Sequence, residues 1–218
     1  MNLASVPKAI LGLVLCVLLP LGFDCQSALA IDDTVPTVTV SQPASSLDQA
    51  LIDISSEEAG VRTTAANLLI EQGGAELIPR LDAIRAEGSR AVRQAIKPVV
   101  DLLKNRANLT HASPDFRRSA ASDLGASGRA EAIPFLKQAA AKESVWWVKY
   151  TMEEAANFLE LRAPDPAVQL AAAKALGELR SSNSVPLLKE LIDAGQAPGA
   201  TAQQQALAAA AATAVERV

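Results

Sequence analysis

The sequence predicts an all-α protein in which three similar helical units follow one another along the chain. From Ser46 onward, apolar residues recur at i, i+3, i+4 and i+7, which is the period of an amphipathic helix. Three segments, beginning at Val61, Phe116 and Val168, also repeat one pattern in register. One unit cannot bury its apolar stripe alone, so we expect the units to stack into one continuous core.

The first thirty residues predict a secretory signal peptide. The apolar run at residues 9–23 is shorter than the roughly 20 residues of a membrane span. Ala28 and Ala30 then supply the small residues of a signal-peptidase site, so we expect cleavage after Ala30 and a periplasmic protein. An uncleaved anchor is the alternative. Cleavage after Ala30 would remove Cys16 and Cys25 together with the signal peptide. No second long apolar run follows in the sequence.

The helical domain is expected to span residues 46–218. Residues 31–45 are rich in Thr, Val and Pro, which predicts an extended leader or linker. Two serines are followed three residues later by Gln or Glu, the pattern of a capping box, and these pairs are Ser46 with Gln49 and Ser55 with Glu58. Further along the chain, Asp115 and Asp165 are expected to cap helices.

Each repeat predicts two helices joined by a polar turn. A Leu lies eight residues after each start, a Pro eighteen residues after it, and another Leu two residues beyond the Pro. These are Leu69, Leu124 and Leu176, then Pro79, Pro134 and Pro186, then Leu81, Leu136 and Leu188. The Pro suits the first turn of the second helix, where its missing N–H costs nothing.

Paired alanines in the first helix of each repeat should let a neighbouring helix approach closely. The pairs are Ala65 with Ala66, Ala120 with Ala121 and Ala171 with Ala172. A third helix is expected after each pair of helices, at about residues 89–105, 144–161 and 201–218.

The repeat pattern resembles HEAT or armadillo-type repeats. Val61-Arg62, Ala65-Ala66 and Ile78-Pro79 with Leu81 carry the resemblance best, and Phe116-Arg117 with Ile133-Pro134 repeats it. The resemblance implies a right-handed α-solenoid of three three-helix units. The chain departs from it in its longer period and in Gln169, which replaces the basic residue. The pattern is specific for fold rather than for function.

A narrower resemblance covers about the last 70 residues. The stretch from Met152-Glu153-Glu154-Ala155 through Ala163-Pro164-Asp165-Pro166 to Leu176 is similar to the exported helical domain of urea-type ABC transporter permeases. This resemblance implies an accessory role in an amide or urea uptake system, with transporter components as partners.

Composition excludes several classes of function. The net charge of -4 disfavours nucleic-acid binding as a main role. His111 is the single histidine, so a Cys/His zinc site and Cys-His catalysis are excluded, and no metal or cofactor is expected. A solvated loop residue is the simpler interpretation of His111. Glu153 and Glu154 are adjacent on a helix and point about 100° apart, so they form no acid/base pair.

Two candidate binding surfaces remain. Trp146, Trp147 and Tyr150 cluster on one predicted helix, where consecutive tryptophans cannot both face the core. The cluster is either a partner-binding anchor or a filler between Ala-rich layers. The second candidate is a row of basic residues on the second helices, which would line a groove or form a solvated face: Arg80, Arg85, Lys137 and Lys189.

These observations predict a non-enzymatic periplasmic module that binds another protein. The competing interpretation is an enzyme or an enzyme-maturation factor, because some HEAT-like proteins act as lyases or chaperones.

Overall fold

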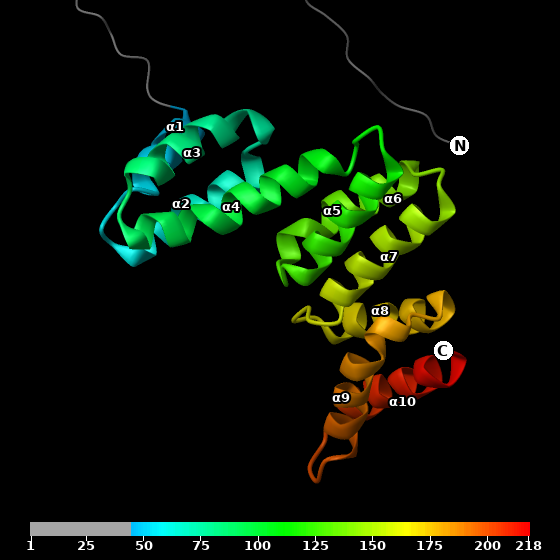
Figure 1. Ribbon diagram of the computed structural model, residues 1–218. Coiled ribbons are helices and arrows are strands. Elements are labelled where there is room, and N and C mark those ends of the chain that lie inside the picture. Colours follow the sequence, from blue (N-terminus) through cyan, green and yellow to red (C-terminus); the bar gives the residue numbers. More distant parts are fainter. Residues whose placement is uncertain (1–44) are drawn as a thin grey trace, which may run out of the picture. The chain divides into compact units, whose positions relative to one another are not determined.

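The computed structural model describes residues 45–218, where all regular structure is helical (Figure 1). Its α-helices are α1 (Ser46–Asp53), α2 (Ala59–Gln72), α3 (Ile78–Glu87), α4 (Arg90–Asn108), α5 (Pro114–Ala126), α6 (Ile133–Lys142), α7 (Trp146–Glu160), α8 (Pro166–Leu179), α9 (Val185–Gln196) and α10 (Ala202–Arg217). Short 3-10 helices precede α3, α6 and α9, at Ala75–Leu77, Ala130–Ala132 and Ser182–Ser184. The predicted all-α class is confirmed for this part of the chain.

The predicted signal peptide, residues 1–30, lies outside the described residues, as does the predicted leader up to residue 44. From residue 45 onward, the structure holds no helix with the length and apolarity needed to cross a membrane.

The capping boxes predicted at the first two helices are wrong. α1 is capped one residue earlier, by Ser45, whose Oγ accepts the backbone N–H of Asp48 at 3.1 Å. In this register the Oγ of Ser45 also donates a hydrogen bond to the carboxylate of Asp48 at 2.8 Å, and Asp48 lies in the first turn, where a carboxylate interacts favourably with the helix dipole. α2 begins after Glu58, which makes no side-chain cap, while the Oγ of Ser56 accepts the N–H of Glu58 at 3.1 Å.

The two predicted aspartate caps have different outcomes. Asp165 caps α8 as predicted, with a carboxylate oxygen accepting the N–H of Ala167 at 2.8 Å. Asp115 is not a cap, because α5 begins one residue before it at Pro114 and its N-cap is Ser113. Asp115 lies instead in the first turn, where its charge favours the helix start.

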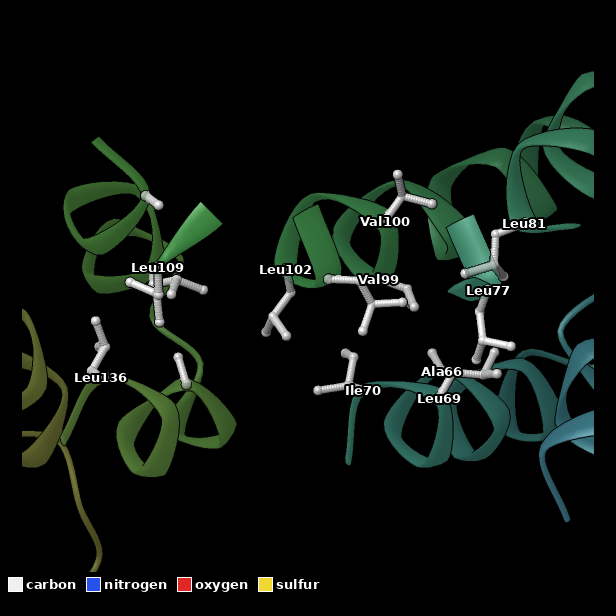
Figure 2. Packing of buried hydrophobic residues seen from close by; sticks show 14 of the residues in the cluster. Ala66, Leu69, Ile70, Leu77, Leu81, Val99, Val100, Leu102, Leu109 and Leu136 are labelled. Atoms are coloured by element: carbon white, nitrogen blue, oxygen red, sulfur yellow. The ribbon is translucent and has the colours of Figure 1, made fainter. Parts of the chain in front are cut away.

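The repeated leucines form the centre of the core, as the sequence predicts. All six are fully buried, with no exposed surface: Leu69, Leu81, Leu124, Leu136, Leu176 and Leu188. Figure 2 shows Leu69 and Leu81 among the packed side chains, and Leu136 further along the same cluster. The repeated prolines occupy the second position of α3, α6 and α9, which confirms their predicted place.

The paired alanines are buried in all three first helices, but the third pair was assigned one residue too early. Ala172 and Ala173 are fully buried, whereas Ala171 is exposed. Counted from the repeat start at Val168, the buried pair occupies the same register as Ala65-Ala66 and Ala120-Ala121.

The helices contact one another by the same scheme three times. α4 packs against α2 and α3, α7 against α5 and α6, and α10 against α8 and α9. Further contacts join α1 to α2, α4 to α5, and α7 to α8. The helices expected after each repeat are therefore present, and each contacts both helices of the repeat before it.

The second position of each repeat has one structural role. Its side chain donates a hydrogen bond to the backbone carbonyl six residues earlier in the chain. The three bonds are Arg62 to Ser56 at 2.7 Å, Arg117 to His111 at 2.8 Å and Gln169 to Ala163 at 2.8 Å. Gln169, which departs from the repeat pattern in charge, therefore keeps the role of the arginines.

Glycines permit close helix contacts in the second and third repeats. A Cβ on Gly125 would lie 2.8 Å from the Cβ of Ala155, and one on Gly177 would lie 2.7 Å from the Cα of Ala214. These positions follow the repeated leucine directly, where the first repeat has the buried Ile70.

The buried side chains of the described region form two hydrophobic clusters, so the prediction of one continuous core is wrong. One cluster runs from Ala50 to Leu159 and the other from Leu161 to Ala214. Where α7 meets the third repeat, the contact includes polar groups. Glu154 accepts hydrogen bonds from the Oγ of Ser181 at 2.6 Å and from the amide of Asn183 at 3.3 Å.

Candidate interaction surface

The aromatic cluster lies on α7, and its three side chains have different environments. Trp146, the first residue of the helix, is 78% exposed. Trp147 is half-buried against the first hydrophobic cluster, and the guanidinium of Arg118 lies 5.4 Å from its ring centroid. Tyr150 is half-buried and donates a hydrogen bond to Glu154 at 3.2 Å. The two tryptophans thus do not share a face, as their spacing indicates.

A half-buried ion pair holds the start of α7 in place. Arg117 of α5 donates Nε to one oxygen of Glu143 at 2.6 Å and Nη2 to the other at 3.0 Å. Glu143 also accepts the backbone N–H of Val145 at 2.9 Å, immediately before Trp146. Its side chain is only 5% exposed. The position of the aromatic cluster therefore depends on a contact between α5 and the α6–α7 turn.

The contact between Arg117 and Glu143 shifts the pKa of both side chains. Hydrogen bonds from Arg117 lower the pKa of the Glu143 carboxyl, against the opposing effect of burial. The bonds to Glu143 raise the pKa of Arg117 in turn. For Tyr150, burial is the main cause of a raised pKa, and the neighbouring Glu154 charge adds to it.

Phe116 is a second exposed aromatic residue that the sequence analysis missed. It is 57% exposed, and its ring centroid lies 4.5 Å from that of His111. His111 is itself exposed, and its Nδ1 accepts the backbone N–H of Ser113 at 3.0 Å. The available signal was the repeat itself, because Phe116 occupies the position held by half-buried valines in the other two copies.

Phe116 and Trp146 lie at the same end of a helix pair. Arg118 contacts Trp147 near the starts of α5 and α7, and Gly125 approaches Ala155 near their ends. The two helices therefore run in the same direction, which places both exposed aromatic side chains at their N-terminal ends.

The predicted row of basic residues is distributed over separate ion pairs. Arg80 pairs with Asp48 at 2.8 Å, linking α3 to α1. Arg85 pairs with Asp82 on its own helix at 2.9 Å. Lys137 on α6 pairs with Glu160 on α7 at 2.6 Å, and Lys189 is exposed on α9. Three of the four side chains are thus partnered by carboxylates of the chain.

Two hollows lie beside α5. One, of about 600 Å³, lies between α4 and α5 and is lined by polar residues that include Asp101, Lys104 and Arg129. The other, of about 350 Å³, lies between α5 and α7 and reaches Asn183. Across residues 45–218, no group of three or more His, Cys, Asp or Glu side chains is arranged to hold a metal ion.

Comparison with protein families finds one match. Residues 116–142 and 168–194 match the PBS lyase HEAT-like repeat. The two matches begin at Phe116 and Val168, the starts of the second and third repeats, and together with the all-helical structure they support a HEAT-like helical repeat protein. A search of curated proteins found no match to this chain.

Proposed function

We propose that the protein is a non-enzymatic interaction module whose helical repeats present a binding surface to another protein. The observation that carries this proposal is Trp146, a tryptophan that is 78% exposed at the start of a helix. Exposing so large an apolar surface to water is unfavourable, and Trp is among the residues that dominate binding energy at interfaces. Phe116, which is 57% exposed, lies at the same end of the helix pair.

Photo-cross-linking tests this surface directly. A photoreactive phenylalanine analogue at position 146, expressed in cells of the source organism, should cross-link to one discrete partner. The matched control is the same analogue at Ile52, which is 63% exposed on α1. A product at 146 that is absent at 52 supports the proposal. Equal products at both positions, or none at either, would reject it.

The finer architecture is part of this proposal. The contact scheme of α2–α4, α5–α7 and α8–α10 is that expected of a right-handed α-solenoid of three three-helix units. In such an arrangement the surface would be curved, and α3, α6 and α9 with their basic residues would occupy equivalent places.

We propose a periplasmic location, supported by the signal-like sequence at residues 1–30. Amino-terminal sequencing of the protein isolated from the periplasm should give Ile31 as the first residue. The intact Met1 terminus in a membrane fraction would contradict cleavage. The resemblance of residues 152–176 to exported permease domains supports a finer proposal, an accessory role in a urea or amide ABC uptake system.

One observation favours a second candidate, an enzyme or maturation factor of the HEAT-like lyase or chaperone type. The matched family carries the description of a lyase repeat. Substitution separates the two functions, because Trp146→Ala should abolish partner binding in the first case. If the protein is an enzyme or a maturation factor, substitutions of residues that line a polar hollow should abolish its function instead.

A further inference from the structure

The hollow between α5 and α7 contains a carboxylate without a positively charged partner. Glu154 accepts hydrogen bonds from the hydroxyl of Tyr150, the Oγ of Ser181 and the amide of Asn183, and all three donors are neutral. Within residues 45–218, Glu154 takes part in none of the ion pairs, whereas Glu143 and the other α7 glutamates each have one. A negative charge is therefore left uncompensated at a half-buried position.

The two oxygens of Glu154 are unequally occupied. Oε1 accepts from all three donors, at distances of 2.6 to 3.4 Å. Oε2 accepts only from Asn183, at 3.3 Å. A carboxylate oxygen offers about two lone pairs, so the remaining acceptor capacity lies on Oε2. A guanidinium binds best through both oxygens of a carboxylate, whereas a compact ammonium needs only one.

The walls of the hollow suit an alkyl chain that ends in an ammonium group. Gly125 and Ala155 form a close apolar contact at one side, and the ring of Phe158 adds further apolar surface. The hydroxyl groups of Ser122 and Thr151 line the same space and have acceptor lone pairs for the other N–H groups. The volume, about 350 Å³, falls within the range of small-molecule sites.

We propose that this hollow binds the ammonium group of a primary alkylamine, with Glu154 as the counter-ion. The group belongs either to a free amine or to a lysine side chain of a protein partner. The site is separate from the surface around Trp146, since it lies against the C-terminal half of α7. Failure of one proposal therefore leaves the other standing.

The test is a chemical-shift titration of the full chain with n-butylammonium chloride, at constant ionic strength. We expect saturable shifts confined to the backbone amides around Thr151, Phe158 and Asn183, and none with 1-butanol. Glu154→Gln removes the charge and keeps the shape, so it should weaken binding by about tenfold or more. The matched control is Glu153→Gln, one residue away on α7, whose carboxylate pairs with Lys149. The affinity of the Glu153→Gln variant for butylammonium should equal that of the wild type.

A second variant covers the case in which Glu154→Gln fails to fold. Ser122 is exposed at the rim of the hollow and makes no hydrogen bond with Glu154, so Ser122→Phe should fill the space and abolish binding without disturbing the network. An unchanged titration in either folded variant, or no saturable shift in the wild type, would overturn the proposal. A lysine-containing pentapeptide that binds more tightly than butylammonium would identify a partner's lysine as the source of the group. Equal affinity would identify a free amine.

Discussion

At the scale of single residues, the structure separates side chains that stabilise the fold from those open to a partner. Arg117 and Glu143 form a bidentate pair with little exposed surface. Arg80 and Lys137, predicted as binding residues, pair with carboxylates while more than half exposed, where such pairs contribute little to stability. Charge alone therefore does not mark a binding residue in this chain.

The Arg117–Glu143 pair predicts a pH-dependent stability. The pKa of Glu143 is lowered in the folded state, so the stabilisation is present above the ordinary carboxyl pKa and is lost as the pH falls through the lowered value. Glu143→Gln should lower the free energy of unfolding at pH 7, and the gap from the wild type should narrow towards pH 3. Urea unfolding at several pH values measures this. A gap that stays constant with pH would contradict it. The control is Glu153→Gln, because the Glu153 side chain is more exposed and its oxygen lies 3.8 Å from the Nζ of Lys149.

At the scale of helices, adjacent residues of one element have opposite roles. Trp147→Ala should lower the free energy of unfolding by roughly 1.5–3 kcal/mol, because this side chain packs against the core. Trp146→Ala should change the free energy of unfolding by no more than about 0.5 kcal/mol, because the Trp146 side chain is in water. Thermal or urea unfolding of both variants checks this. Similar losses in both would mean that Trp146 is not free in solution.

The close contact between α8 and α10 predicts an effect opposite to helix propensity. Gly→Ala in an exposed helix interior stabilises by about 1 kcal/mol. Gly177→Ala should instead destabilise, since its Cβ would meet the backbone of Ala214. Gly60→Ala on α2 is the matched control, because the nearest atom to its Cβ would be 3.8 Å away, and it should stabilise or be neutral. Stabilisation by both substitutions would contradict the close contact.

At the scale of the whole described domain, the two hydrophobic clusters predict unfolding in two steps. The cluster of Leu161–Ala214 has a larger share of alanine among its buried residues than the first cluster, and alanine buries less apolar surface than leucine or valine. We expect the third repeat to open first. Hydrogen exchange followed by mass spectrometry should show faster exchange over 162–218 than over 61–159 at low urea. One cooperative transition over both ranges would contradict this.

The sequence by itself determined the helical class, the places of the three repeats and the buried leucines. These features depend on the period and spacing of apolar residues along the chain, which can be read without knowing any contact between distant segments. It also located the additional helices closely, as α4, α7 and α10. Its errors in capping were shifts within short polar stretches, where Ser45 and Ser46 offer competing registers one residue apart.

Only the tertiary structure decided which side chains are exposed and which contacts join distant segments. The exposure of Trp146 rather than Trp147 depends on how α7 rests on α5, and the placement of Glu154 depends on Ser181 and Asn183 in the following repeat. The division of the buried side chains into two hydrophobic clusters also depends on the tertiary packing. The bonds of Arg117 to Glu143 and of Ser181 to Glu154 join residues 26 and 27 positions apart, and no local pattern specifies such contacts.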